Sequence, residues 1–458
     1  MNAARSPELS TSTALEDFKT LLRFDTTNPP GNEMPAALWV MERLQSVGLT
    51  PELLVSEGRP NVVVRIEGDG TGGGPLLLAG HIDVVAVDRE HWSFDPFAAV
   101  ESAGYLYGRG TIDMKHMVIY CMYAVMRLAQ TGRRPSRDII LAVVSDEEAG
   151  CTHGSKFLVD EYPEKVRATH MLGEFGGFSQ DSRGLRFYPI QVAEKGVCQF
   201  HLRAKGSPGH GSIPIADNAV ARLGRAVDLL GRTRLPRHPT RTVQASIRAM
   251  AAAQPAVVAA IFRQSLNPLV GDLILDRVLP DRSVADTLSA CMRNTATPTM
   301  LRAGAQKNVI PSDAVATIDG RTLPGQTAED LLREVRAVIG DGYETEIITW
   351  RPGRENTDVE RDPMYRAICD NVRLSDPVGL PVPYMITGFT DAQQFGRLGM
   401  QCYGYAPVRY PEADNVKFAR LIHGHDERIH VEGFRWGVTS FLQLLSTLTG
   451  CSLVDGWS

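Results

Sequence analysis

The sequence predicts an α/β fold in which a mainly parallel sheet is covered by helices and interrupted by a smaller α+β domain. Two continuously apolar segments, 76–80 and 139–144, have the composition of strands buried on both faces, and an amphipathic helical segment at 114–131 separates them. Strands of this kind joined through helices are typical of parallel sheets. Between residues 190 and 350 the strands alternate in polarity, which is typical of antiparallel sheets with one exposed face.

The expected elements follow one another in a regular order. In the first part they are helices at 15–24, 35–47 and 114–131, and strands at 61–66, 76–80, 139–144 and 169–172. In the middle they are strands at 197–203, 314–319 and 343–350, and helices at 218–230 and 328–339. The last part returns to α/β character and ends in a helix at 431–448. We therefore expect one domain formed by residues 1–189 and 351–458, and an inserted domain at 190–350.

Composition excludes several classes of protein. The 458 residues are 43% hydrophobic and 22% charged, which is close to the average for a globular chain and leaves ample apolar material for a core. A net charge of −5 argues against binding to nucleic acid or to an anionic membrane. Seven scattered cysteines without a CxxC pair, and a first segment without the apolar core of a secretory signal, indicate reduced thiols and a cytoplasmic location.

Acidic and imidazole side chains follow the expected strands at the points where these end. His81 and Asp83 follow one strand, Glu147 and Glu148 follow a second, and Glu174 follows a third. The carboxyl ends of parallel strands meet at one edge of a sheet, where open α/β proteins bind ligands. We therefore expect these side chains to converge in one crevice.

A bound cation would explain such a cluster. Asp113 follows a Gly-Arg-Gly loop at 108–110, which is flexible enough to bring it to the same place. Several carboxylates in a dry crevice repel each other unless a cation compensates, and a mixed shell of His and carboxylate favours Zn²⁺, Mn²⁺ or Co²⁺. On an extended segment Asp83 can accept the second N–H of His81 and so determine its tautomer. A lone His-x-Asp is more often structural and a lone Glu-Glu pair is usually a solvated helix face, but their combination predicts a metal site.

With these motifs in place, the chain resembles the M20 metallopeptidase family, which includes aminoacylases, glutamate carboxypeptidases, acetylornithine deacetylases and succinyl-diaminopimelate desuccinylases. The resemblance extends in order over nearly the whole chain. It is carried by the segments 80–85 (GHIDVV), 107–115 (YGRGTIDMK), 146–150 (DEEAG), 209–214 (GHGSIP), 308–311 (NVIP), 319–321 (DGR) and 423–429 (HGHDERI). The element from Trp92 to Phe97 is most similar to the aminoacylase and carboxypeptidase branch.

The resemblance implies a site for two metal ions. One ion would be held by His81, Asp113 and Glu174, and the other by Asp113, Glu148 and His423, with Asp113 bridging. Two ions about 3.5–4 Å apart can together bind the attacking water and the carbonyl oxygen of a substrate.

The resemblance also assigns catalytic roles. Glu147 would be the general base, because a carboxylate that is fully coordinated to metal is a poor base. Asp83 would orient the ring of His81. In the family the peptide bond after the bridging aspartate is cis, which here is the bond between Asp113 and Met114.

The inserted domain would act as a lid and a dimerisation domain. His210 would reach the partner subunit's active site and stabilise the tetrahedral oxyanion, whereas without the resemblance it would be a turn histidine between two glycines. Asn308 and Arg321 match residues that bind the substrate carboxylate, a task that suits the guanidinium fork, although Arg321 alone would be interpreted as a surface salt bridge. The loop 387–393, which contains Gly388, would line the substrate pocket.

The chain departs from the family pattern at three places. His425 stands where the family more usually has Pro, so His423 and His425 compete for the ligand role, and the alignment favours His423. His116 stands near the expected metal site where Gly is common. Gln393 replaces an Arg in the substrate loop, which leaves the substrate preference open.

We therefore expect a homodimeric two-metal hydrolase that cleaves an amide C–N bond next to a free carboxylate, in an N-acyl amino acid or a small peptide. The alternative is hydrolysis of a non-peptide substrate, such as a ureido or carbamoyl compound or an aromatic amine that carries a carboxylate. A remote alternative is an inactive binding protein on the same fold, against which the intact Glu147, Asp113 and His81 argue.

Overall fold

The computed structural model describes residues 7–182, 184–278, 282–414 and 421–457, which form two compact units. The first unit contains the described residues up to Val192, together with Asn356–Val382 and those from Thr390 onward. The second contains Ala193–Glu355 and Pro383–Phe389. The short segment 383–389, which the sequence pattern assigned to the first domain, packs with the second unit.

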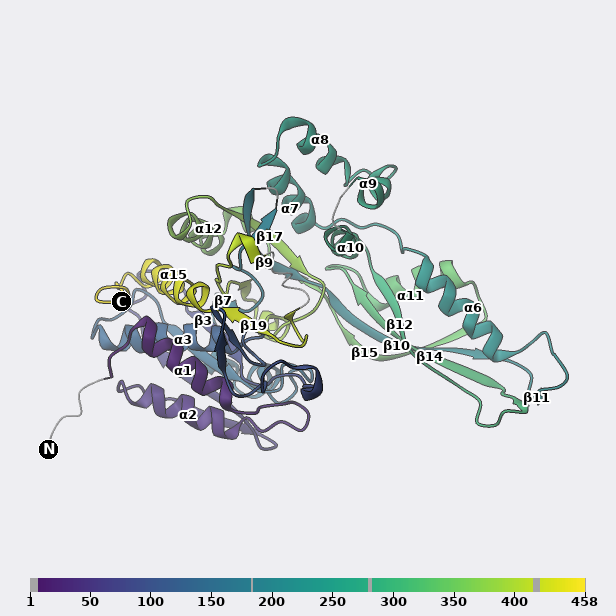
Figure 1. Ribbon diagram of the computed structural model, residues 1–458, viewed down its shortest axis with the longest axis horizontal. Helices are drawn as coiled ribbons and strands as arrows, with labels where there is room; N and C mark the ends of the chain where they lie inside the picture. Colours follow the sequence, from purple (N-terminus) through teal and green to yellow (C-terminus); the bar gives the residue numbers. More distant parts are fainter. Residues whose placement is uncertain (1–6, 183, 279–281, 415–420, 458) are drawn as a thin grey trace. The chain divides into compact units, whose positions relative to one another are not determined.

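The first unit is built on a mainly parallel sheet, which confirms the predicted fold class. The strands of this sheet lie in the order β1-β2-β6-β3-β7-β18-β9, followed by the short strand β16 (Arg354–Glu355). The bounds of the other strands are β1 Glu52–Ser56, β2 Arg59–Ile66, β3 Leu76–His81, β6 Ile139–Val144, β7 His170–Gly173, β9 Leu185–Glu194 and β18 Gln401–Gly404. Figure 1 labels β3, β7 and β9 of this sheet. The central strands β6, β3, β7 and β18 are parallel to their neighbours in this group, whereas β1, β2 and β9 are antiparallel.

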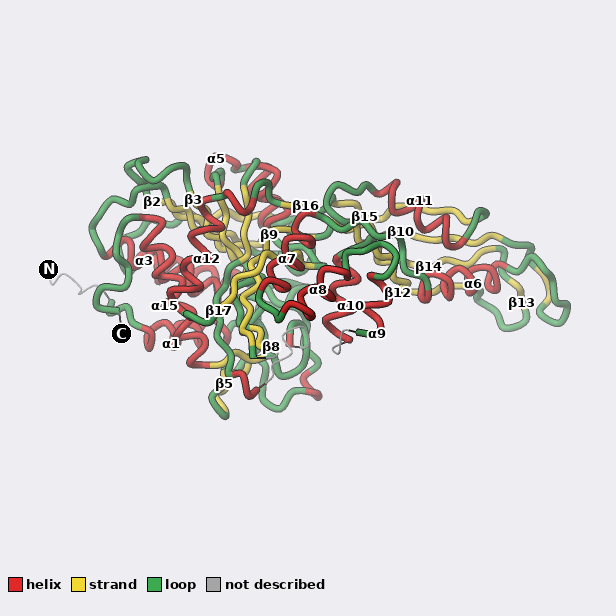
Figure 2. Tube along the Cα trace, turned by 90° about the horizontal axis from the view of Figure 1, so that it is seen from above, coloured by secondary structure: helices red, strands yellow, loops and turns green. Residues whose placement is uncertain are grey.

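Helices and smaller strands complete this unit (Figure 2). The helices are α1 Thr11–Arg23, α2 Met34–Gln45, α3 Lys115–Gln130, α4 Ser155–Glu161, α5 Pro163–Val166, α12 Pro363–Ser375, α13 Ala392–Phe395 and α15 Val431–Thr449. Four short 3₁₀ helices also lie among the described residues of this unit: Arg89–His91, Val359–Arg361, Gly396–Leu398 and Glu412–Asp414. The strands β4 Val100–Ser102, β5 Tyr105–Tyr107 and β19 Arg428–His430 form a separate small sheet, and β8 Gln180–Ser182 pairs with β9. The strand β17 Gly379–Ile386 crosses into the second unit.

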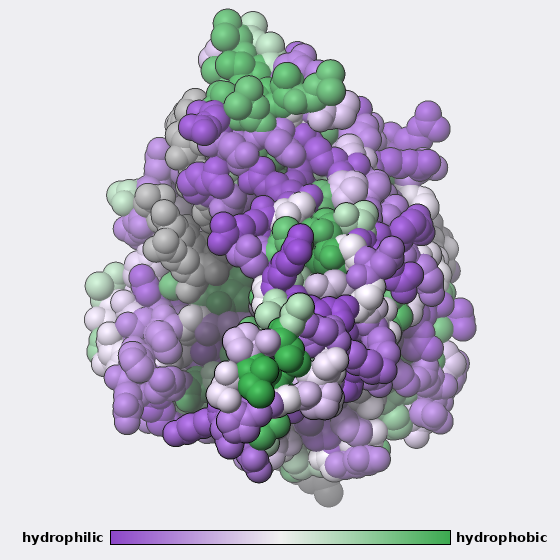
Figure 3. Space-filling model, turned by 90° about the vertical axis from the view of Figure 1, so that its right-hand side faces the viewer, coloured by the Kyte–Doolittle hydropathy of each residue, from purple (hydrophilic) through white to green (hydrophobic). Residues whose placement is uncertain are grey.

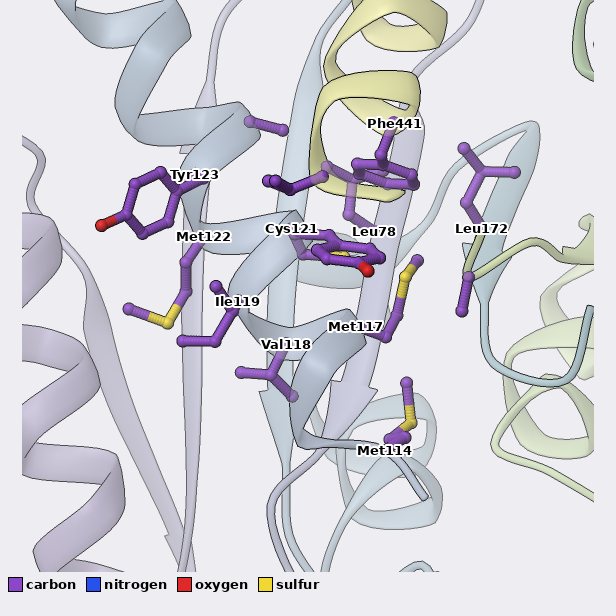
Figure 4. Packing of buried hydrophobic residues seen from close by; sticks show 14 of the residues in the cluster. Leu78, Met114, Met117, Val118, Ile119, Cys121, Met122, Tyr123, Leu172 and Phe441 are labelled. Carbon is purple, nitrogen blue, oxygen red and sulfur yellow. The ribbon is translucent and has the colours of Figure 1, made fainter. Parts of the chain in front are cut away.

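The two faces of the sheet are both buried, which explains why its central strands are continuously apolar. Along β6, Leu141 and Val143 pack into one hydrophobic cluster with residues of α1, α3 and α15, whereas Ile140 and Ala142 pack into another with residues of α4 and α13. Figure 4 shows the first of these clusters, in which Phe441 of α15 lies with side chains of α3 and of the strands. Alternate side chains of a strand point to opposite faces, so both faces must be apolar here.

The second unit has an antiparallel sheet in the order β12-β14-β10-β15. Buried residues of β10 and β14, such as Phe200 and Ile318, pack against residues of α6 and α11, such as Leu223 and Leu331. The strands are β10 Gly196–Lys205, β11 Gly209–His210, β12 Thr295–Ala303, β13 Val309–Ile310, β14 Asp313–Thr322, β15 Tyr343–Arg351 and β16 Arg354–Glu355, and the two helices are α6 Ala219–Arg232 and α11 Ala328–Ile339. The short strands β11 and β13 pair with each other.

Four further helices of this unit were not predicted from the sequence. They are α7 Arg241–Ala252, α8 Ala256–Gln264, α9 Gly271–Arg277 and α10 Arg282–Cys291. Several apolar residues of α8, of α9 and of the turn between them are exposed, including Val257 (74%), Leu273 (61%) and Leu269 (90%). Hydrophobic atoms accordingly gather on the surface at α8 (Figure 3). Among the described residues, no helix is long and apolar enough to cross a membrane.

Candidate metal centre

Three adjacent parallel strands bring the predicted acidic and imidazole residues to one edge of the sheet. His81 is the last residue of β3, Glu147 and Glu148 follow β6, and Glu174 follows β7. The strand β3 pairs with β6 on one side and with β7 on the other, so the backbone ladder sets the spacing of these side chains. The convergence predicted from the sequence is therefore present.

Asp113 lies between two imidazoles. Its Oδ1 is 3.2 Å from His81 Nε2, and its Oδ2 is 3.2 Å from His423 Nε2. The Asp113–Met114 peptide bond is cis, as the resemblance implied. Each oxygen of one carboxylate thus faces a different histidine.

The neighbouring carboxylates complete two groups of potential metal ligands that share Asp113. The first is His81, Asp113 and Glu174, and the second is Asp113, Glu148 and His423. Within each group the ligand atoms lie within 4.8 Å of one another, and Glu148 Oε2 is 3.2 Å from His423 Nε2. The sets are those that the sequence analysis assigned to two ions.

Glu147 lies beside the first group without belonging to either. Its Oε2 is 4.0 Å from His81 Nε2, and its side chain is buried. Burial and the nearby charge of Glu174 raise the pKa of Glu147 well above its usual value. A carboxyl group of raised pKa at the edge of a metal site is suited to taking up and releasing a proton.

The ligand carboxylates are in an environment that disfavours their charge. Burial, followed by the charge of Asp113, raises the pKa of Glu148 to about 7, and burial raises that of Glu174 well above its usual value. Glu148 Oε1 and Glu174 Oε1 are buried without a hydrogen-bond partner in the part of the chain that the structure describes. A buried carboxylate oxygen without a donor is costly, and a divalent cation would supply the missing partner. The donor set therefore fits a cation with oxygen and imidazole ligands.

The histidines respond to the same charges in the opposite sense. Burial opposes protonation of His81, but hydrogen bonds to Asp113 and other carboxylates outweigh it and hold its pKa well above the usual value. Hydrogen bonds to Asp113 and Glu148 raise the pKa of His423 to about 10. Without a cation, protons on these rings compensate the carboxylates, so metal binding must displace them.

Asp83 organises the site from behind. The Nδ1 of His81 is 2.9 Å from the carbonyl oxygen of Asp83 and 3.5 Å from its Oδ1, so the backbone oxygen is the nearer acceptor. The carboxylate of Asp83 accepts hydrogen bonds from the backbone N–H groups of Glu147 and Glu148, both at 3.1 Å, and from Asn28 Nδ2 at 2.8 Å. Asp83 thus orients the acidic turn as well as the imidazole.

The two other histidines of the sequence analysis lie outside both ligand groups. The ring of His425 is exposed and stacks on that of His91, with 5.1 Å between centroids. His116 is buried, its ring meets the edge of Tyr120, and burial lowers its pKa to about 4. Of the competing pair, His423 is the one that faces Asp113 and Glu148.

The remaining predicted residues belong to the second unit. His210 is exposed on β11, where its Nδ1 is 2.7 Å from Ser212 Oγ. The carbonyl oxygen of Asn308 accepts a hydrogen bond from the adjoining Gly211, so His210 and Asn308 lie on neighbouring segments. Arg321 Nε donates to Asp319 Oδ1 at 2.8 Å. This is a salt bridge of the kind expected for Arg321 without the family resemblance. Gly388 faces open space, since a Cβ there would lie more than 4 Å from every described residue other than its two chain neighbours.

Two residues with clear contacts at the site were given no role in the sequence analysis. Glu427 and Arg109 form a buried ion pair, with 2.7 Å between Oε2 and Nη1, directly behind the turn that ends in Asp113. Both lie inside motifs that carry the resemblance, which was the available signal. Their pairing could not be inferred from the sequence, because the two residues lie 318 positions apart along the chain.

Substitution of His423 tests the second ligand group, and substitution of His425 is the matched control. We expect His423→Ala to lose about one of two Zn²⁺ ions per chain, because it removes one of three ligands. His425→Ala, two residues away on the same loop, should keep both. The measurement is elemental analysis after reconstitution and removal of excess metal. Equal metal content in the two variants would contradict the assignment of His423.

Comparisons with known proteins identify relatives of this chain. The sequence model of peptidase family M20/M25/M40 matches residues 77–447. Aminoacylase-1 of Sus scrofa is 28% identical over 439 residues, which are 94% of this chain and 94% of that protein. The N-fatty-acyl-amino acid synthase/hydrolase PM20D1 of Homo sapiens is 28% identical over 388 residues, 83% of this chain and 75% of that protein.

A solved structure shows the same fold. An M20 family metallo-carboxypeptidase from Sulfolobus solfataricus superposes with a TM-score of 0.72 at 16% identity, covering 95% of this chain and 99% of that one. Because the family match spans most of the chain, the chain belongs to the M20/M25/M40 peptidase family, whose members are metal-dependent hydrolases of C–N bonds.

Proposed function

We propose that this protein uses two metal ions to hydrolyse the amide bond of N-acyl amino acids. The observation that carries the proposal is the placement of Asp113, whose two carboxylate oxygens each lie 3.2 Å from a different histidine. A carboxylate in this position is suited to bridge two cations. When bound, the ions would polarise the substrate carbonyl and lower the pKa of the attacking water.

Glu147 would move the proton in this reaction. It is buried, it stands outside both ligand groups, and the contact of its backbone N–H with Asp83 holds it in place. In the proposed reaction its carboxylate takes a proton from the attacking water and returns it to the leaving amine.

The substrate class is supported by the relatives and by the second unit. Aminoacylase-1 and the N-fatty-acyl-amino acid synthase/hydrolase carry N-acyl amino acid chemistry in their names. In this chain, Arg321 and Asn308 would bind the free carboxylate of such a substrate. Arg321 would do so by redirecting a guanidinium that now pairs with Asp319.

We also propose a homodimer in which the second unit acts as a lid. His210 is exposed, and because its Nδ1 contacts Ser212, its Nε2 is free to donate to a substrate oxygen. An exposed histidine can stabilise an oxyanion only if another surface covers it, and the proposed cover is the active site of the partner subunit. A cytoplasmic location is supported by the seven cysteines, which are buried thiols outside any disulfide.

A substrate panel tests the reaction. We expect turnover of N-acyl amino acids, and a kcat/KM at least about 100-fold lower for the matching N-acyl amino acid amides, because they lack the carboxylate that the site binds. Dipeptides and N-carbamoyl amino acids complete the panel. Activity confined to N-carbamoyl or aromatic amine substrates would favour the alternative reaction, and equal activity on acids and amides would contradict carboxylate recognition.

The acidic pair after β6 should separate catalysis from metal binding. Glu147→Ala should lower kcat by about 10²–10⁴-fold while both ions stay bound, because the proton carrier is lost and the ligands are not. Glu148→Ala, the adjacent change, should lose an ion. The measurements are steady-state kinetics and metal content on the same samples. Metal loss in Glu147→Ala would make Glu147 a ligand instead of the base.

Mixing two inactive variants tests the role of His210 across subunits. In a mixed dimer of Glu147→Ala and His210→Ala chains, one site has an intact Glu147 and receives an intact His210 from the partner. We expect about a quarter of wild-type activity after the chains are unfolded and refolded together, because about half of the dimers are mixed and each has one complete site. Each variant refolded alone is the control. No recovery would place His210 in its own chain's site or outside catalysis.

A further inference from the structure

A buried carboxylate that the proposed reaction does not use holds the loop that carries His423. Glu427 lies four residues after His423 and has no exposed surface. Its Oε2 accepts a hydrogen bond from Arg109 Nη1 at 2.7 Å. Its Oε1 accepts from the backbone N–H of Ile112 at 2.8 Å and that of Asp113 at 3.3 Å. The carboxylate therefore binds the backbone of the turn that ends in Asp113.

Arg109 extends this link to other parts of the site. Its Nη2 lies 3.4 Å from the carbonyl oxygen of His423 and 3.5 Å from that of Ala86, in the segment that follows β3. Its guanidinium lies over the ring of Trp92, 5.2 Å from the centroid. The Arg109–Glu427 pair thus joins the segments on which His423, Asp113 and the continuation of β3 lie.

The candidate ligands need this link to different degrees. His81, Glu148 and Glu174 follow neighbouring strands, so the backbone ladder of the sheet maintains their spacing. Asp113 and His423 come from loops, and the side chain of His423 is 49% exposed. The nearest strand pairing joins Arg428 of β19 to Tyr107 of β5, five residues after His423 and six residues before Asp113. Side-chain contacts across these remaining residues must therefore set the 3.2 Å between Asp113 Oδ2 and His423 Nε2.

We propose that Glu427 is a positioning residue for the second ligand group: together with Arg109 it sets the separation of the Asp113 and His423 loops, and so the affinity for the second ion. The inference rests on the proposed two-metal site. Hydrogen-bonding partners behind metal ligands typically change metal affinity by about 10–100-fold. The first group should depend on Glu427 much less, since two of its three members follow strands.

The test is Glu427→Gln, titrated with Zn²⁺ after metal removal. Glutamine keeps the shape of the side chain and an acceptor for the loop N–H groups, but its amide presents a donor to Arg109. We expect the second Zn²⁺ to bind about 10–100-fold more weakly, with the first nearly unchanged. An ion pair that served only the fold would weaken both ions alike or neither, so the split between the two affinities is the informative readout.

Two further variants control for stability. Ser93→Ala removes a hydroxyl that donates to Asp426 at 2.7 Å, an exposed contact of the same loop that does not touch Asp113, and it should leave both affinities unchanged. A single uncompensated buried charge is strongly destabilising. If Glu427→Gln does not fold, the double variant Arg109→Met, Glu427→Gln removes both charges together and should show the same selective loss of the second ion.

The outcomes separate this inference from the proposed function. Wild-type protein that binds two Zn²⁺ ions, with a selectively weakened second ion in Glu427→Gln, supports the positioning role. If the wild type binds two ions and Glu427→Gln weakens both by the same factor, or neither, the positioning role is overturned and the two-metal site stands. A wild-type chain that binds fewer than two ions overturns both.

Discussion

The concentration of negative charge at the edge of a buried sheet is the constraint on which this structure depends. Glu147, Glu148, Glu174 and Asp113 converge where little water can screen them, and burial raises the pKa of the three glutamates. Such a group is stable only with compensating positive charge, which the raised pKa values of His81 and His423 already indicate. Two divalent cations would compensate this negative charge more fully. The hydrophobic layers on both faces of the sheet hold the strands, and hence the charges, in place.

Support behind the ligands comes from two carboxylates that do not themselves face the candidate metal positions. Asp83 accepts hydrogen bonds from the backbone of the acidic turn after β6, and Glu427 does the same for the turn before α3. Each buried carboxylate accepts hydrogen bonds from backbone N–H groups in a turn that follows a strand, β6 for Asp83 and β5 for Glu427. The site therefore combines positions set by the sheet with positions set by these carboxylates.

The second unit has a different physical character. Its sheet is antiparallel with one face covered by α6 and α11, and its predicted functional residues are exposed or half-buried. The side chains of His210 and Arg321 hydrogen-bond to residues two positions along the chain, Ser212 and Asp319. Side chains with such modest local contacts can exchange them for a substrate, which suits the lid that we propose.

The sequence by itself determined the α/β class and the strands β3 and β6, because continuously apolar strands are local patterns. The charged residues after these strands predicted a metal site, and the resemblance to the M20 family, which the comparisons confirmed, supplied the two sets of candidate ligands. The sequence did not predict the helices α7–α10, and it favoured His423 over His425 only through the alignment with the family. Only the tertiary structure placed one of these rings against Asp113 and the other on His91, and only it joined Arg109 to Glu427. These choices depend on contacts between loops far apart in the chain, and such contacts leave no periodic signal in the sequence.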